Sequence, residues 1–516
     1  MTGAPHAIAG LFRAAAPAAI VVDDADECAL ASADIAGPGE CAAAAILKPG
    51  DRDDVEKIVR VARREGVALF PRGGGWSYSG GYTPSRAPAA MVDLSRLTDI
   101  AIERDAARVR VGAGTSWGAL YAALDGAGLR VPSFGPLSGI GATVGGLVSQ
   151  NGGFFGTAGH GTIADKSLLG ATMVAGSGDT ITLTPADRVD GVAAPQPLAG
   201  DCGAFGVRTE IALALMPRPA TTLFASFAFV EGRDVLAALR ALGGIAGLGE
   251  AYVFDPGAHA NLARSGFSTI EGATLAGDVL KASRNVLSGI ADVVRAARWS
   301  KTAIASLAWS LHVSVEGDER DAEAALAEVA RRATAAGGIS IPDVIPRVTR
   351  ARPFRHIKAL LGPEGELWLP THGVFSLDDA PRGLAAIAAL LAERAPIMRA
   401  HAIRASILAV LMGDRIVIEP QLFWPDALSP LHRRLVQPDQ LASFGDRPGQ
   451  PAARAMVHEL RRALIAALDG AGAAHHQIGR AYAAHPGVAD RVKDRWHELK
   501  RELDPDRIMN PGVLGL

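Results

Sequence analysis

A glycine-rich segment early in the chain combines residue types that bind anions. It reads FPRGGGWSYSGGYTP over residues 70–84, with three consecutive glycines after an apolar run. Glycine tolerates positive φ and lets a ligand approach the backbone closely, and successive N–H groups in such a loop form a cradle for an anion. The segment lacks both the P-loop and the Rossmann glycine signatures. It therefore predicts an anion-binding loop or, alternatively, a tight turn between strands.

A second glycine-rich segment covers residues 132–161 and has ten glycines among its thirty residues. This composition predicts neither a regular helix nor a good strand. Its apolar members, such as Leu137, Ile140 and Val144, are poor choices for an exposed linker. We therefore expect its backbone to wrap a flat, partly apolar ligand, with a long surface loop as the alternative.

Five residues are candidates for proton transfer. Histidine is the usual general base near neutral pH, and a carboxyl group within an apolar strand is costly unless it meets a cation or has a raised pKa. The candidates are His475 and His476 in GAAHHQIGRAY, His372 in LWLPTHGVFS, Glu419 in RIVIEPQLFW, and Tyr482. The alternatives are two exposed loop histidines, a buried hydrogen-bonded His372, and a Glu419 with a purely structural partner.

A basic run, RVTRARPFRHIK, covers residues 347–358 and includes Arg347 and Arg350. Arginine binds carboxylates and phosphates through two parallel hydrogen bonds. The run predicts a solvated basic loop, a site for a substrate anion, or a docking face for an acidic electron-transfer partner.

Short alternating helices and strands must position the glycine segments. The spacing predicts a helix over 53–65, capped by Asp51 or Asp53 and ended by Gly66. It also predicts a strand after Gly66, a strand over 107–112, a helix over 117–124, and a hairpin over 168–183 around the turn GSGD.

After Pro217 and Pro219 the pattern changes to longer helices between strands, which indicates a second α+β domain. Strands are expected near 223–230, 312–316 and 416–423, and helices near 234–242, 321–335, 382–394 and 488–503. We expect domains over residues 1–218 and 219–470, with residues 471–516 returning to the first domain.

Composition excludes several classes of protein. The 516 residues carry 52 Lys and Arg against 54 Asp and Glu, so a generally basic nucleic-acid binder is excluded. The 49% hydrophobic fraction is that of an ordinary globular protein. Three cysteines are too few for a disulfide framework, and no signal peptide or membrane span is evident. We expect a cytoplasmic protein.

The segments together resemble the FAD-binding domain of the vanillyl-alcohol oxidase family, also called the p-cresol methylhydroxylase type. The matching motifs are Arg72–Gly75, Thr143–Gly146, Gly206–Thr209 and the closing LDPDRIMNPG over 503–512. The resemblance implies an α+β fold, with a two-subdomain FAD-binding domain and an α+β cap domain containing an antiparallel sheet.

The resemblance also assigns a set of residues to the cofactor. It implies that Arg72, Gly73, Gly74, Gly75, Trp76, Ser77 and Gly81 cradle the pyrophosphate, that Pro136, Leu137 and Ser138 approach the flavin, that Thr143, Gly146, Ser149, Asn151 and Gly153 line the isoalloxazine and diphosphate path, and that Val207 contacts the adenine side through its backbone.

The chain departs from the family at several positions. Many members attach FAD through a His where this chain has Trp76, and no Cys lies within 132–161, so we expect non-covalent FAD. Ser138 stands where phenol-oxidising and cytokinin-oxidising members carry a carboxylate base. The His-containing metal motif of the D-lactate dehydrogenase-like branch reads MGDRIVIEP over 412–420 and has no His, so we expect no metal.

The resemblance implies an FAD-dependent oxidase or dehydrogenase that oxidises a CH–OH group of an alcohol or 2-hydroxy acid by hydride transfer to flavin N5. The alternatives are a flavin-dependent transferase resembling alkyl-dihydroxyacetonephosphate synthase and a non-catalytic flavoprotein subunit. The expected partners are a small-molecule substrate and either O₂ or an electron-acceptor protein, and a homodimer is compatible with this reading.

Overall fold

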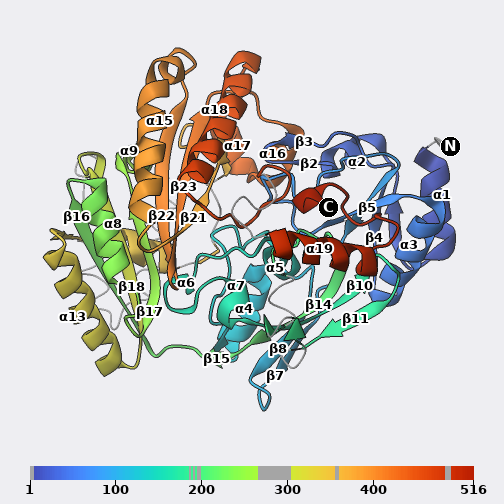
Figure 1. Cartoon of the computed structure of the whole chain (residues 1–516), viewed down its shortest axis with the longest axis horizontal. Helices are drawn as coiled ribbons and strands as arrows, with labels where there is room; N and C mark the ends of the chain where they lie inside the picture. Colours follow the sequence, from blue (N-terminus) through green and yellow to red (C-terminus); the bar gives the residue numbers. More distant parts are fainter. Residues whose placement is uncertain are drawn as a thin grey trace. The chain divides into compact units, whose positions relative to one another are not determined.

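A computed structural model describes residues 5–184, 188–189, 192–193, 199–264, 304–351, 353–354, 360–482 and 490–516. Its contacts divide the chain into two compact units. Unit 1 comprises Met1–Gly153, Thr162–Arg218 and His475–Leu516, and unit 2 comprises Phe154–Gly161 and Pro219–Ala474. Figure 1 gives the course of the chain through both units.

Unit 1 contains a four-stranded sheet in the order β1-β4-β6-β5, whose last three strands run parallel. The elements of this part are α1 (Pro5–Ala15), β1 (Ile20–Val22), α2 (Ala25–Ala31), β2 (Ala33–Asp34), β3 (Gly37–Pro38), β4 (Ala45–Lys48), α3 (Arg52–Glu65), β5 (Ala68–Arg72) and β6 (Ala89–Asp93). Helix α3 confirms the predicted helix: the Asp51 side chain accepts from the Asp54 N–H at 2.8 Å, and Gly66 ends the helix with φ of 66°.

A second, five-stranded antiparallel sheet of unit 1 has the order β11-β10-β14-β8-β7. Its strands are β7 (Ile100–Glu103), β8 (Arg108–Gly112), β10 (Leu168–Ala175), β11 (Thr180–Leu183) and β14 (Gly206–Ala214), with α4 (Trp117–Gly126), α5 (Val144–Gln150), α7 (Ile163–Lys166), β9 (Leu129–Arg130), β12 (Arg188–Val189), β13 (Val192–Ala193) and β15 (Met216–Pro217) around them. The predicted hairpin is confirmed as β10–β11, and the predicted helix as α4.

The expectation that residues 132–161 form no helix is wrong, because α5 and α6 (Thr157–His160) lie within them. Thr143 Oγ1 caps α5 by accepting from the Gly146 N–H at 3.1 Å. A Cβ at Gly145 would come within 2.7 Å of the Ala113 side chain. Close packing of small residues beyond strand β8 therefore stabilises a helix that intrinsic propensity disfavours.

The chain ends in unit 1 with α19 (Asp490–Leu503) and a short 3₁₀ turn, Val513–Gly515. Leu69 of β5 pairs with Met509 in a parallel bridge, through hydrogen bonds from Leu69 N to Ile508 O and from Asn510 N to Leu69 O, each 2.8 Å long. The C-terminal motif thus extends the edge of the parallel sheet directly before the first glycine loop.

Unit 2 is built on an eight-stranded sheet in the order β19-β16-β18-β17-β22-β23-β20, with β21 also paired to β23. All of its described strand pairs are antiparallel, as predicted. Its elements are β16 (Thr221–Phe229), α8 (Gly232–Ala241), β17 (Leu248–Phe254), α9 (Pro256–Arg264), β18 (Trp309–Gly317), α13 (Glu319–Ala335), β19 (Ile339–Ile341), α14 (Val344–Ala351), β20 (Leu367–Pro370), β21 (Gly373–Ser376), α15 (Ala380–Ala400), β22 (Arg404–Met412), β23 (Arg415–Trp424), α16 (Pro430–Leu435), α17 (Pro438–Phe444) and α18 (Pro451–Gly470).

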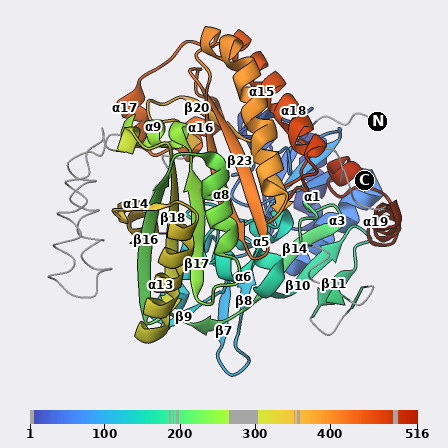
Figure 2. The same cartoon turned by 60° about the vertical axis from the view of Figure 1, so that its left-hand side comes forward.

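One face of this sheet is apolar and packs against helices. Leu311, Val313 and Ile418 on this face are fully buried, and helices α8, α13, α15 and α18 overlie the sheet in Figure 2. A Cβ at Gly383 of α15 would meet the Phe375 ring, which shows how closely helix and sheet approach.

The alternate positions of the same strands form the opposite face, which we call the polar face. It carries Glu250, Tyr252 and Phe254 of β17; Ser310, His312, Ser314 and Glu316 of β18; Arg404, Ser406 and Leu408 of β22; and Glu419 and Gln421 of β23. Among the described residues, no helix is long and apolar enough to cross a membrane.

Candidate functional site

The first glycine loop follows β5 and presents unused backbone donors. Gly75 has φ of 77°, and Tyr82 Oη donates to its carbonyl at 3.0 Å. Within the described part of the chain, the N–H groups of Gly74, Gly75 and Trp76 make no hydrogen bond. The buried Arg72 Nε also lacks a hydrogen-bond partner there. Donors left unused in one short loop fit a bound phosphate group.

The glycines of this loop are also required by packing against the second glycine segment. A Cβ at Gly74 would collide with the Gly141 carbonyl, and one at Gly73 would collide with Thr143 Oγ1. The Trp76 indole lies against Gly141, where a Cβ would overlap the ring. The two segments are therefore close neighbours, which spacing alone did not indicate.

The second segment begins α5 with backbone donors that are bound within unit 1. At the start of α5, the N–H groups of Val144 and Gly145 donate to Thr115 O and Ala113 O at 2.9 and 3.0 Å, and that of Gly146 donates to Thr143 Oγ1. The backbone donors at the start of α5 are therefore already used by the protein. The turn over Pro136–Ala142 instead exposes apolar side chains, with Leu137 at 38% and Ile140 at 36%, as expected for a surface that covers a flat ligand.

Four further cofactor candidates of unit 1 lie in α5, directly after it and in β14. Asn151 ends α5 with φ of 49°, Gly153 follows it, and Val207 is buried in β14 opposite Val174. Ser149 Oγ accepts from Arg208 Nη1 at 2.9 Å. Their contacts with a cofactor stay predictions.

Arg208, which donates to Ser149, also forms a buried ion pair that the sequence analysis did not predict. Arg208 Nη1 donates to Asp201 Oδ1 at 2.7 Å, and both side chains are at most 4% exposed. The G-x-x-T motif contains Arg208 at a variable position, so the motif gave no signal for the pair.

Asn510 of the closing motif, together with Arg480, makes hydrogen bonds to the first glycine loop. Asn510 Nδ2 donates to Gly81 O at 2.7 Å and to Cys202 O at 2.6 Å. Arg480 Nη1 donates to Gly80 O at 2.6 Å, and its Nη2 donates to Asn510 Oδ1 at 2.7 Å. The tail was noted as a motif, but these contacts show what its Asn does.

The residues that follow the histidine pair contact both glycine segments within unit 1. Gln477 N donates to Gln150 O at 2.9 Å, and Arg480 N donates to Ser79 O at 2.8 Å. The ring of the partly exposed His475 contacts the ring of the buried Tyr482, with centroids 4.4 Å apart and the planes tilted by 30°. His476 is 9% exposed. The structure thus brings three of the proton-transfer candidates into one turn beside the glycine loops.

The other two candidates lie side by side in unit 2. Leu408 of β22 pairs with Glu419, and the register from Pro370↔Gln421 to Gly373↔Ile418 places His372 opposite Glu419 on the other side. His372 is fully buried, while Glu419 is partly exposed. Burial raises the pKa of Glu419 to about 7, although a hydrogen bond from Gln421 acts against this shift.

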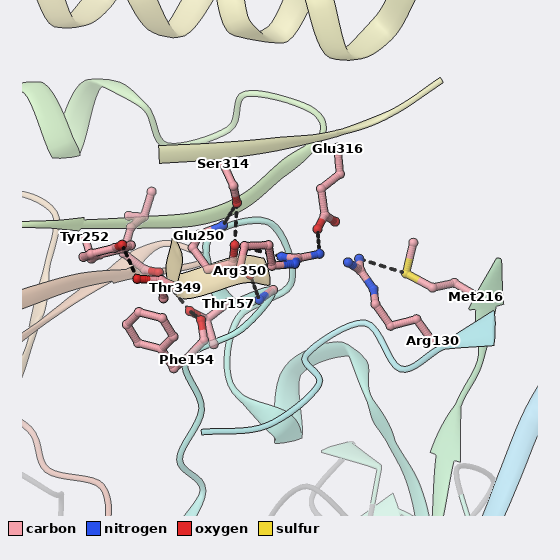
Figure 3. Close-up of polar contacts among 12 residues, drawn as sticks. Arg130, Phe154, Thr157, Met216, Glu250, Tyr252, Ser314, Glu316, Thr349 and Arg350 are labelled. Carbon is pink, nitrogen blue, oxygen red and sulfur yellow. Dashed lines mark hydrogen bonds and ion pairs between the residues drawn. The ribbon is translucent and has the colours of Figure 1, made fainter. Parts of the chain in front are cut away.

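Two further carboxylates on the polar face bind a residue of the basic run (Figure 3). Arg350 Nη1 donates to Glu250 Oε1 at 2.6 Å, and its Nη2 donates to Glu316. Arg347 pairs with Asp343 at 2.6 Å. Both arginines are therefore engaged by the protein rather than solvated, while Arg352, Arg355 and Lys358 lie outside the described residues. Sequence reasoning missed Glu250 and Glu316.

A buried histidine network on the same face was also missed. His259 Nε2 and His312 Nε2 each lie 2.7 Å from Ser310 Oγ, and His312 Nδ1 lies 2.9 Å from Ser226 Oγ. Burial lowers the pKa of His259 to about 4 and that of His312 to about 3. Both rings are therefore neutral at physiological pH.

Comparison with known proteins accounts for the two glycine segments. A model described as FAD binding domain matches residues 43–184, and one described as FAD linked oxidases, C-terminal domain, matches residues 438–514. A D-lactate dehydrogenase of Archaeoglobus fulgidus is 28% identical over 190 residues, which is 36% of this chain and 42% of the relative. The matches to fungal FAD-linked oxidoreductases span only 28–30% of those proteins' length.

Solved structures show the fold over the whole chain. A p-cresol methylhydroxylase with bound substrate matches with a TM-score of 0.71 at 13% identity, covering 100% of this chain and 98% of that one. An alkyldihydroxyacetonephosphate synthase matches with a TM-score of 0.61 at 15% identity, covering 91% and 76%. The cofactor of the matched binding domain is FAD.

Proposed function

We propose that the chain is an FAD-dependent oxidase or dehydrogenase acting on a CH–OH group, because its sequence matches an FAD binding domain over residues 43–184 and its fold is that of p-cresol methylhydroxylase. The observation that carries this proposal is the first glycine loop, whose unused N–H donors at Gly74, Gly75 and Trp76 fit a pyrophosphate. The exposed apolar side chains of the second loop fit a flat ring system.

Bound FAD would supply a hydride acceptor at N5, and the protein must then supply binding, orientation and a proton acceptor. The first loop would hold the pyrophosphate through its N–H groups and Arg72. The tail would keep that loop in place through Asn510 and Arg480. The hydroxyl proton requires a base, and the candidates are the histidine turn of unit 1 and the Glu419–His372 pair of unit 2.

We also propose that FAD is bound without a covalent link. Trp76 occupies the position of the linking His in the family and has no nucleophilic nitrogen for that bond. Acid precipitation should release all of the FAD into the supernatant. Flavin that stays in the pellet would contradict the non-covalent proposal.

We also propose an electron acceptor and a cellular compartment for this protein. The reduced cofactor would be reoxidised by O₂ or by an electron-carrier protein. The three cysteines are free, which supports a reducing compartment such as the cytoplasm.

A transferase that uses the flavin without net oxidation is the second candidate. The His-rich turn at 472–482 and the fold match to alkyldihydroxyacetonephosphate synthase support it. Such an enzyme would not consume simple alcohols or hydroxy acids as reductants.

An anaerobic substrate panel separates these candidates. FAD-loaded protein would be mixed with alcohols and 2-hydroxy acids while the visible flavin absorbance is followed. The oxidoreductase proposal predicts bleaching by at least one of them. Absence of bleaching with the whole panel would contradict it and leave the transferase or a non-catalytic subunit.

A further inference from the structure

Resting on the proposed function, we propose that Lys48 and Arg72 together bind a phosphate group at the carboxyl end of the parallel sheet of unit 1. Lys48, Asp93 and Arg72 are the last residues of β4, β6 and β5. The register pairs Leu47 with Val92 and Arg72 with Asp93, so the three charged residues form a row on one face of the sheet. Ligands of open α/β sheets bind at this end of the strands.

Asp93 brings the two cations close together. Arg72 Nη1 and Lys48 Nζ each lie 3.7 Å from the same oxygen, Asp93 Oδ2. The two nitrogens are therefore no farther apart than twice that distance. Asp93 Oδ1 accepts from the Ser95 N–H at 2.9 Å, which fixes the carboxylate between the two cations.

Both cations keep hydrogen-bond donors for a ligand. A contact of 3.7 Å is an ion pair, but it is longer than a hydrogen bond. Within the described part of the chain, Lys48 Nζ makes no hydrogen bond, and the buried Arg72 Nε has no partner either. The side chain of Lys48 is 33% exposed and that of Arg72 is 15% exposed, so a ligand can reach both.

The Arg72 guanidinium also lies against the first glycine loop. A Cβ at Gly75 would collide with Arg72 Nη2, and Arg72 Cζ lies 5.6 Å from the centre of the Tyr82 ring. Tyr82 Oη donates to Gly75 O at 3.0 Å, and burial raises the pKa of Tyr82, so this phenol adds no negative charge. The cation pair is therefore next to the unused N–H groups of the loop.

The chemistry of the row favours a phosphate group. Two cations share one carboxylate. Arginine binds phosphates through parallel hydrogen bonds, and lysine binds them as a point charge. The oxygens of one phosphate group can accept from both side chains and from backbone N–H groups of a glycine loop. The pyrophosphate of FAD is one source of such a group, and a separate phosphate is the other.

The test is an equilibrium titration of the FAD-free, full-length protein with FAD at low and high salt. Lys48→Gln should weaken FAD binding about ten-fold, or about 1.4 kcal/mol. Its affinity should also depend less on salt than that of the wild type, because one cation no longer meets the phosphate.

Two further variants serve as controls. Lys48→Arg keeps the positive charge and should retain most of the affinity for FAD. Lys57→Gln is the matched control, because Lys57 is exposed on α3 of the same unit. It should bind FAD with the affinity and the salt dependence of the wild type.

A second titration distinguishes the two sources of the phosphate group. Inorganic phosphate would be added to the FAD-loaded protein, and its binding would be followed by calorimetry. If a separate phosphate occupies the row, inorganic phosphate should bind to the loaded wild type and not to loaded Lys48→Gln, while both proteins bind FAD equally well.

Three results would overturn a part of this account. If Lys48→Gln loses neither affinity for FAD nor binding of phosphate, the phosphate site is refuted. If Lys48→Gln and Lys48→Arg lose affinity for FAD equally and keep the salt dependence of the wild type, Lys48 has a structural role and the site is also refuted. If the wild type binds no FAD, the proposed function fails, whereas binding of inorganic phosphate that Lys48→Gln lacks would still support the site.

Discussion

The replacement Asn510→Asp tests how the C-terminal motif supports the cofactor loop. Asn510 is fully buried, and its Nδ2 donates to Gly81 O and Cys202 O at 2.7 and 2.6 Å. The isosteric carboxylate has no donor for either carbonyl. Two buried acceptors would lose their partner, at about 1–3 kcal/mol each.

Arg480 Nη2 already donates to Asn510 Oδ1 at 2.7 Å, so the new carboxylate would gain an ion pair that offsets roughly 1 kcal/mol. The net loss in free energy of unfolding should be about 3 kcal/mol. If half of that loss falls on the glycine loop that contains Gly81, FAD should bind about ten-fold more weakly, since 1.4 kcal/mol corresponds to a factor of ten.

Urea unfolding measures the first quantity, and FAD titration followed by flavin fluorescence measures the second. Asp506→Asn is the control, because Asp506 lies in the same motif, is 47% exposed and pairs only with Arg63 at the surface among the described residues. Its effect should stay below about 1 kcal/mol. If Asn510→Asp unfolds and binds FAD like the wild type, the proposed support of the loop by the tail is refuted.

Other predictions concern buried charges. Arg208→Met should lower the free energy of unfolding by about 3–5 kcal/mol, because it leaves Asp201 buried without its ion-pair partner. The control Arg110→Met, at an arginine 44% exposed, should lower it by less than about 1 kcal/mol in urea unfolding. Equal losses for the two variants would contradict the prediction. Because the pKa of Glu419 is raised to about 7, stability should fall as pH rises from about 4.3 towards 7, and Glu419→Gln should raise the melting temperature more at pH ~8 than at pH ~5. Burial lowers the pKa of His259, His312 and His432 to about 4, 3 and 4. Unfolding should therefore take up as many as three protons through these side chains as pH falls below about 6.5, and the melting temperature should fall with pH. Melting temperatures that stay constant from pH ~6.5 to ~4.5 would count against neutral buried histidines.

Local signals predicted much of the secondary structure. Helix α3 has its periodic apolar face, an Asp cap and a terminal glycine, and each feature acts as expected. Helix α5 was missed because its glycines lower helix propensity. Its stability depends on close packing against Ala113, which no local pattern reveals.

The candidate site was predictable where family motifs mark it and not where long-range pairing builds it. The first glycine loop could be found by its composition. By contrast, Glu419 and His372 are 47 residues apart, and only the strand register makes them neighbours. Glu250 and Glu316 are isolated acidic residues in the sequence, and their shared partner Arg350 becomes apparent only in the folded sheet.

Binding of FAD by the first glycine loop is tested by an equilibrium titration of the wild type and of Gly74→Val with FAD. A Cβ at Gly74 would collide with the Gly141 carbonyl and close the approach between the two glycine segments. Circular dichroism would show that the variant is folded. We expect one FAD bound per wild-type chain and none bound to the folded variant. A folded Gly74→Val protein that binds FAD with wild-type affinity would contradict it.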